Sequence, residues 1–284
     1  MSASEIMPSQ GTSTFDLFAL RFHCTAETPV HFPPGETANL FRGQFGKILH
    51  RYDAATYARF FAPIRETGVP SGLHDPPRPF VLRVRHLEGA SLKSFHIDMN
   101  VFETNQPDPV HLCQAIADLV RESLRAEVCR VEGLEMLRLP LPDDVARASR
   151  RAASTVVSTC RVTFLSPTEL KNQKSPDFGP LFRRIRDRIS TLRALYGPGP
   201  LEIDFKAMGN RAAAIRMTHC ETYPVAAERT SRTTGQRHRL GGFVGFDEYE
   251  GDLTEFIPYL EIAAYTGVGR QTVWGKGEIK VETF

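Results

Sequence analysis

The sequence predicts an α+β fold made of two tandem ferredoxin-like domains. Two observations support this prediction. Hydrophobic residues follow strand and helix periods in the order β-α-β-β-α-β, and this order occurs twice along the 284 residues. A chain of this length can also bury two separate cores, in domains of roughly 140 residues each. The order defines the ferredoxin-like unit, in which two helices cover one face of a four-stranded antiparallel sheet.

The first predicted domain covers residues 14–139. Its first strand, residues 14–24, alternates apolar residues with polar ones. A helix over residues 107–125 follows from apolar residues at helical spacing, with Asp108 as its expected N-cap. The remaining predicted elements are a helix at 38–52 and strands at 80–84, 94–102 and 131–139.

The second predicted domain covers residues 154–284, after a linker at 140–153 that contains Pro142. Its longest helix, residues 178–196, has apolar residues at helical spacing. This helix also has five arginines against one acid, which indicates either a phosphate-facing surface or an ordinary solvated face. The other predicted elements are strands at 155–165, 211–223, 238–249 and 275–281 and a helix at 253–264.

Composition and charge narrow the class of protein. With 41% apolar and 24% charged residues, disorder, collagen and coiled coil are disfavoured. No apolar run approaches the ~18 residues of a membrane-spanning helix. No basic residue precedes Arg21, so we expect no secretory signal and a cytoplasmic location. The net charge of +2 neither requires nor excludes a nucleic-acid partner.

The five cysteines are scattered along the chain, and none forms a CxxC pair. Without a secretory signal, this pattern predicts reduced core thiols rather than disulfides or structural zinc. The sequence also lacks Walker, GxSxG and HExxH motifs. We therefore expect neither a metal nor a cofactor.

A Gly-rich segment at residues 267–277 follows a predicted helix and precedes a predicted strand. Dinucleotide-binding and P-loop glycines need the opposite order, so this segment does not fit those motifs. Glycines would let an RNA backbone approach closely, cations would pair with phosphates, and a tryptophan would stack on a base. An ordinary glycine turn is the alternative. The candidate RNA-binding residues here are Gly267, Gly269, Arg270, Trp274 and Lys276.

The first predicted helix has an apolar stripe on one side and His50 on the other. Gly43, Gly46 and Lys47 share the face of His50. Two glycines inside an exposed helix cost roughly 1 kcal/mol each, which suggests that something approaches this face closely. The alternative is that the glycines admit the following loop and that His50 is a solvated surface histidine.

A third cluster lies at residues 228–239, where four arginines alternate with hydroxyl and amide side chains around Gly235. These groups suit contacts with phosphate, ribose and base edges. A solvated edge hairpin is the alternative. The candidate RNA-binding residues in this segment are Arg229, Ser231, Arg232, Arg237 and Arg239.

Together these motifs resemble a known family. The matching segments are residues 40–51, 70–72, 77–80, 164–167, 231–232, 240–245 and 267–277. The chain resembles the CRISPR-associated endoribonucleases that cut repeat transcripts into guide RNAs, the sixth Cas family of the RAMP superfamily. Within this resemblance, the closing Gly-rich segment is the most specific motif and the Pro-rich segment is the least specific.

The resemblance implies an activity and a site. Family members cut the CRISPR repeat without metal, by attack of a ribose 2′-hydroxyl that leaves a 2′,3′-cyclic phosphate. The matching catalytic position is His50, with Lys47, Arg51 and Tyr52 as helpers. Tyr52 falls on the apolar stripe, which counts against it, and His23 on the first strand is a weaker candidate. The resemblance adds Arg42 to the candidate RNA-binding residues.

Two other functions stay open at this point. The chain could be a non-catalytic RAMP subunit that holds guide RNA in a CRISPR effector complex, or a protein-interaction module without an RNA role. The partners expected from the leading hypothesis are CRISPR repeat RNA and its processed product, with other Cas proteins as further candidates. We expect no membrane partner, and the sequence leaves monomer and homodimer open.

Overall fold

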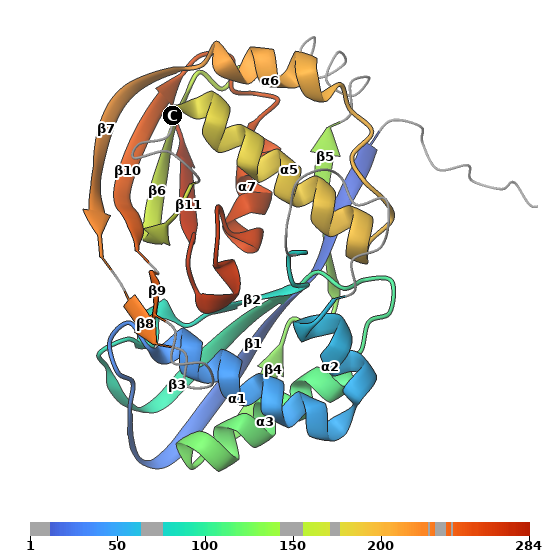
Figure 1. Ribbon diagram of the computed structural model, residues 1–284, viewed down its shortest axis with the longest axis vertical. Helices are drawn as coiled ribbons and strands as arrows, with labels where there is room; N and C mark the ends of the chain where they lie inside the picture. The colour runs from blue at the N-terminus through green and yellow to red at the C-terminus, as the bar shows by residue number, and fades with distance from the viewer. Residues whose placement is uncertain are drawn as a thin grey trace, which may run out of the picture.

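The computed structural model describes residues 12–63, 76–142, 156–170, 177–226, 228–230, 237–239 and 241–284, the two short segments as backbone only. Two antiparallel sheets form its framework, one in each half of the chain (Figure 1). Helices cover one face of each sheet. The predicted pair of ferredoxin-like domains is confirmed.

The N-terminal sheet has the strand order β2-β3-β1-β4, and β5 pairs with the first part of β1. Its strands and helices follow the β-α-β-β-α-β order, with α2 added after α1 and the 3₁₀ helix η1 after β2. The elements are β1 (Thr12–His31), α1 (Thr37–Tyr52), α2 (Ala54–Phe61), β2 (Phe80–Arg83), η1 (Arg85–Leu87), β3 (Ser91–Val101), α3 (Pro109–Leu124), β4 (Ala126–Glu132) and β5 (Met136–Pro142).

The predicted strand at 131–139 is wrong in one respect, because the chain forms two strands there. Gly133 separates β4 from β5 with a φ of +75°, a conformation that disfavours side chains. A Cβ at this position would collide with the carbonyl oxygen of Ala19 on β1. The break allows β4 and β5 to flank different parts of β1, which is therefore longer than predicted.

The C-terminal sheet has the strand order β11-β6-β10-β7. The predicted strand at 238–249 is also split, into β9 and β10, and α6 was not predicted. A separate hairpin is formed by β8 and β9. The elements are β6 (Thr159–Thr168), α5 (Phe178–Tyr196), α6 (Phe205–Ala213), β7 (Arg216–Val225), β8 (Glu228–Thr230), β9 (Arg237–Arg239), β10 (Gly242–Glu250), α7 (Ile257–Thr266), η2 (Thr272–Trp274) and β11 (Ile279–Thr283).

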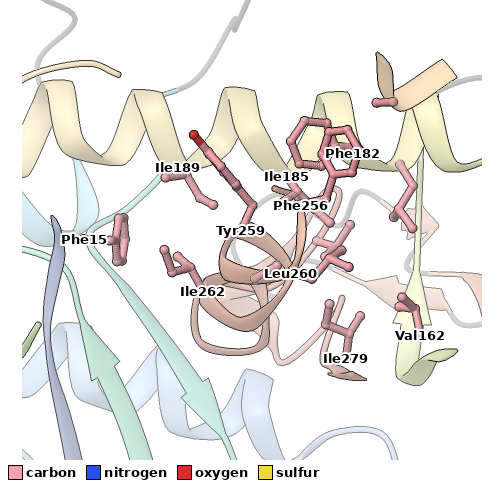
Figure 2. Packing of buried hydrophobic residues seen from close by; sticks show 14 of the residues in the cluster. Phe15, Val162, Phe182, Ile185, Ile189, Phe256, Tyr259, Leu260, Ile262 and Ile279 are labelled. Carbon is pink, nitrogen blue, oxygen red and sulfur yellow. The ribbon is translucent and has the colours of Figure 1, made fainter. Parts of the chain in front are cut away.

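Two apolar cores hold the molecule together. One lies between the N-terminal sheet and the helices α1 and α3. In the other, Phe182 of α5 packs against Tyr259 of α7 and the C-terminal sheet, and Phe15 of β1 extends this core into the N-terminal half (Figure 2). The two halves thus share buried apolar surface. Among the described residues, no helix combines the length and apolar character required to cross a membrane.

The C-terminal end of α7 fixes the two halves to each other. Arg83 donates to the carbonyls of Ala264 and Tyr265 at 3.1 and 3.2 Å, and Asn100 donates to Tyr265 at 3.0 Å. From α5, Arg188 donates to Thr266 at 3.0 Å. Cations at this end complement the negative pole of the helix. Burial lowers the pKa of Arg83 and of Arg188, the latter to about 10.

The arginines of α5 correct one sequence interpretation. Arg186 and Arg193 are buried, and Arg186 donates to the carbonyl of Phe205 at 2.6 Å. Arg188 bonds to the end of α7, so three of the five arginines are directed into the protein. The other two, Arg183 and Arg184, are exposed. The helix is therefore not a simply solvated face, and its exposed cations are limited to Arg183 and Arg184.

Candidate functional site

The helix α1 presents the predicted histidine to solvent. Phe41, Phe45 and Ile48 are buried against the sheet, whereas Lys47 and His50 are exposed on the other side. The helix ends at Tyr52 because the next residue is extended and caps α2. Within the described part of the chain, no hydrogen bond or ion pair engages the side chains of Lys47 and His50.

A short aromatic row beside His50 was not predicted. The His50 ring meets the ring of Tyr57 edge-on, with centroids 4.9 Å apart. Tyr57 in turn stacks on Phe61, with centroids 5.2 Å apart. Both aromatic residues come from α2, so this helix positions the imidazole. The N-cap Asp53 followed by aromatic residues at helical spacing is the sequence signal that could have predicted α2.

The two glycines of α1 have different surroundings. Gly46 is buried, and a Cβ there would lie 3.0 Å from Cε1 of Phe61. Gly46 therefore makes room for the chain that follows α1, as the alternative predicted, but this part of the chain is the helix α2 and not a loop. Gly43 is exposed, with nothing within 4 Å of the place of a Cβ. Of these two glycines, only Gly43 leaves space for a ligand to approach the helix from solvent.

The other two catalytic candidates are directed at α3. Arg51 pairs with Glu122 at 2.6 Å, which raises the pKa of Arg51. The Tyr52 hydroxyl donates to Asp118, and this hydrogen bond raises the pKa of Tyr52. Tyr52 is 39% exposed, so its expected place on the apolar stripe was wrong. Both side chains tie α1 to α3 through acids.

The glycines at 267–277 shape a tight loop. Gly267, Gly269 and Gly277 have positive φ, and a Cβ on Gly277 would collide with the carbonyl oxygen of Val268. Several of the loop's N–H groups bond internally: Val268 donates to Gly277 at 2.8 Å, and Arg270 donates to the Glu169 carbonyl at 3.1 Å. These N–H groups are therefore occupied within the fold.

The Gly-rich loop packs against α1 through η2. The guanidinium of Arg42 lies 5.1 Å from the centre of the Trp274 ring and 5.5 Å from that of Phe61. A Cβ on Gly275 would lie 2.9 Å from the Cβ of Ala38, so glycine permits this packing. The structure thus brings two predicted segments, α1 and the Gly-rich loop, onto one surface.

The loop's cations differ in their surroundings. Arg270 pairs with Glu169 at 3.0 Å, and its side chain is 65% exposed. Lys276 is half-buried; burial lowers its pKa, and the nearby charge of Glu88 acts in the opposite direction. Arg270 is therefore the more accessible of the two for an RNA phosphate.

The predicted Arg-rich hairpin forms as β8 and β9, with Arg229 opposite His238. The structure gives the backbone of Arg237 and Arg239 in the same hairpin. Ser231 and Arg232 lie outside the described residues. The role of this hairpin stays a prediction.

His23 lies away from this site. It is on β1 between two core residues, so its ring points to the face of the sheet opposite α1. Its Nε2 lies 2.8 Å from Glu132 on β4. His23 is therefore not grouped with His50.

One group of potential metal ligands lies in the described part of the chain. Atoms of Asp53, Asp108 and His111 lie within 4.8 Å of one another. The carboxylate of Asp53 accepts from the Ala55 amide at 2.8 Å, and that of Asp108 accepts from the His111 amide at 3.1 Å. Both acids cap helices, which accounts for their positions without a metal.

The cysteines partly follow the prediction. None is in a disulfide, and Cys24 and Cys160 are buried, which raises the pKa of each to about 12. Cys129 and Cys220 are exposed, so the expectation of core thiols was wrong for these two. Both lie on edge strands of their sheets, β4 and β7.

Comparisons with known proteins agree with this architecture. Residues 162–279 match the family model of the CRISPR-associated endoribonuclease Cas6. A Cas6 of Thermus thermophilus, in its product complex, aligns with 95% of this chain and 100% of its own, at 15% identity and a TM-score of 0.59. The product complex of Cas6 (TTHA0078) aligns with 94% of this chain and 99% of its own, at 18% identity and a TM-score of 0.57.

A third similar structure is a partial Cas6-RT-Cas1–Cas2 complex, of which one chain covers 99% of this chain and 47% of its own length, at 12% identity and a TM-score of 0.53. No curated protein matches the sequence. In fold over nearly its whole length, and in sequence over residues 162–279, the chain is similar to Cas6, and the predicted resemblance to the sixth Cas family is confirmed.

Proposed function

We propose that this protein is an endoribonuclease that cuts CRISPR repeat RNA, with its catalytic groups on α1. The observation that carries the proposal is the exposed imidazole of His50, with the Lys47 ammonium one turn earlier on the same face. The Gly-rich loop, inside the segment that matches the Cas6 family model, packs on this helix.

In the proposed reaction a ribose 2′-oxygen attacks the adjacent phosphorus, and the bond to the 5′-oxygen of the next nucleotide breaks. The products are a 2′,3′-cyclic phosphate and a 5′-hydroxyl. A proton leaves the 2′-hydroxyl, and another joins the departing oxygen. Histidine side chains suit such transfers because their ordinary pKa lies near neutral pH, so His50 is assigned one of them, and Lys47 suits the negative charge on the phosphoryl oxygens. The scheme uses side chains alone.

Two predicted helpers are left out of this mechanism. The Tyr52 hydroxyl already donates to Asp118, and its raised pKa makes it a poor base. Arg51 is paired with Glu122. Tyr57 takes a positioning role instead, because its ring contacts that of His50.

The RNA would follow α1, the Gly-rich loop and the β8–β9 hairpin. Gly43 leaves open space on α1, and Arg270 offers an exposed cation. Gly267 and Gly269 act by shaping the loop. The residues proposed to contact RNA are Arg42, Arg229, Ser231, Arg232, Arg237, Arg239, Arg270, Trp274 and Lys276.

The test is cleavage of an end-labelled CRISPR repeat RNA from the host's own array, in the presence of EDTA. A single cut that leaves a cyclic phosphate is the expected result. Binding without a cut would favour the non-catalytic RAMP subunit. Neither binding nor cutting, even at low salt, would overturn both RNA functions. Association with other Cas proteins is a separate prediction.

A further inference from the structure

The face of the N-terminal sheet that is turned away from α1 and α3 carries three histidines in a row. His23 of β1 pairs in register with His96 of β3, and their ring centroids lie 6.5 Å apart. His86 of η1 stacks on His96, with centroids 4.0 Å apart and planes within 15°. We call these three side chains the histidine row.

Alternation along the strands gives the row its orientation. The neighbours of His23, Phe22 and Cys24, are buried in the core beside α1 and α3, and the neighbours of His96 are buried there too. Both imidazoles therefore point to the other face of the sheet. The side chains of His23 and His96 are 30% and 34% exposed, so solvent reaches both rings.

The C-terminal half covers only part of this face. Leu17 of β1 is buried in the core that contains α7, and Asn100 of β3 reaches the end of α7. The histidine row lies further along the same two strands. An ion pair between Arg85 and Glu278, at 3.7 Å, joins η1 to the C-terminal half. The row is thus an open surface next to the boundary between the halves.

Two arginines flank the row. Arg21 makes two bonds to Asp98, at 2.7 and 2.8 Å, yet its side chain is 46% exposed. Arg130 pairs with Glu132, and its side chain is 63% exposed. The exposed Arg130 pair contributes little stability, so a phosphate oxygen can take the place of its carboxylate oxygen. The two bonds of Arg21 use only part of the five N–H groups of its guanidinium.

The RRM, a four-stranded sheet that binds single-stranded RNA, stacks two or three bases on aromatic rings of the sheet. Here β1 lies between β3 and β4, and β3 lies between β2 and β1, so both are central. We propose that the histidine row stacks bases of a single-stranded segment of the bound RNA, while Arg21 and Arg130 hold its phosphates. The proposal rests on the proposed function and adds a second RNA contact, on the face opposite His50.

The proposal carries a pH dependence. Burial, and then repulsion from His86, lower the pKa of His96, which favours the neutral form of its ring. A phosphate beside the row would favour the protonated ring, so RNA binding should take up protons and tighten as pH falls. The charged or titratable groups that face the row are Arg21, Arg85, Asp98, Arg130 and Glu132.

The test is the affinity of the full-length chain for fluorescein-labelled repeat RNA, at about pH 6 and about pH 8. A His50→Ala background prevents the proposed cleavage during the binding measurement. In this background, replacing His96 and His86 together by Ala should weaken binding at about pH 6 roughly tenfold, and should flatten the pH dependence. His96→Phe should keep the stacking but lose most of the pH dependence.

The matched control is His31→Ala. His31 is an exposed histidine at the end of β1, the strand that carries His23. It is bonded to Ser91 at 3.1 Å and lies outside the row. It should bind RNA as the background does at both pH values. Row variants that fold, by thermal unfolding, and bind RNA as His31→Ala does would overturn this inference alone. No RNA binding by the wild-type chain would overturn both it and the proposed function.

Discussion

The two sheets have the same topology but differ in their outer faces, the faces away from their helices. On the N-terminal sheet the outer face carries the histidine row between exposed Arg21 and Arg130. On the C-terminal sheet the corresponding central strands carry Arg161 and Phe246, and the guanidinium stacks on that ring at 4.4 Å. Arg161 also bonds to Glu248 at 2.6 Å.

The remaining side chains strengthen this difference. His219 stacks on Phe246 and lies 3.5 Å from Glu221, so its nitrogen faces a carboxylate. By strand register, four glutamates share the C-terminal outer face: Glu221, Glu248, Glu250 and Glu282. Three of these glutamates form ion pairs on this face, with Arg161, Arg216 and Lys280. The two faces therefore share a topology but differ in their side chains, and we expect RNA to bind the N-terminal one, since a fold alone does not assign function.

The largest expected effect is on the rate of RNA cleavage, which should depend on a histidine of the N-terminal half and not on one of the C-terminal half. His50→Ala should lower the rate of repeat cleavage by about 10²–10⁴, because a proton-transfer group is lost. The matched control is His219→Ala, another exposed histidine, which lies on the C-terminal outer face. It should cleave at the wild-type rate in the same single-turnover assay. Equal cleavage rates for the two variants would show that the catalytic groups do not lie on α1.

The next effect is on the free energy of unfolding and comes from the Gly-rich loop of the C-terminal half. Gly277→Ala should lower the free energy of unfolding by at least ~2 kcal/mol, because φ is +68° and the new Cβ meets the Val268 carbonyl oxygen. Gly43→Ala, in the open on α1, should raise stability by about 1 kcal/mol. Chemical denaturation measures both. A neutral Gly277→Ala would mean that the loop can relax at little cost.

A smaller effect involves a charge on the inner face of the C-terminal sheet. Asp247 is buried, and burial raises the pKa of its carboxyl. Its stabilising contribution is therefore complete below the ordinary aspartate range and is lost as pH rises through the raised folded-state value. Asp247→Asn should raise the free energy of unfolding by about 1–3 kcal/mol at neutral pH and change little in acid. Denaturation at several pH values tests this, and a gain that persists in acid would contradict it.

The smallest effect compares one arginine from each outer face. Arg130→Ala should weaken RNA binding a few-fold and reduce the salt dependence of log Kd by about 0.7, the slope for one phosphate contact with single-stranded RNA. Arg161→Ala should change neither, because this side chain is stacked on Phe246 and bonded to Glu248. Salt titrations of both variants make the measurement. Equal slopes would erase the distinction between the faces.

The sequence was sufficient for features that depend on local pattern. The stripe of α1 correctly placed Lys47 and His50 in solvent, and Asp108 caps α3 as expected. Features that depend on a distant partner could not be predicted this way. Gly46 makes room for Phe61, and Arg188 reaches the end of α7; neither partner can be inferred from helical periodicity.

The site itself shows the same limit. The family resemblance proposed Tyr52 as a helper, but its hydroxyl donates to Asp118 on another helix. Spacing missed Tyr57, because the α2 helix after Asp53 was not recognised. Whether a side chain on a helix is available depends on which charged groups the neighbouring helix brings to it, and that is tertiary information.

The end of α7 has a consequence for how this protein can change. Its last carbonyls are shared between Arg83 and Asn100 from one half and Arg188 from the other. A chimaera that joins either half to the other half of a distant relative would leave buried carbonyls or a buried guanidinium without a partner. The halves repeat one fold, but they are not interchangeable modules. We expect substitutions at Arg83, Asn100 and Arg188 to depend on one another, because all three side chains bond the end of α7.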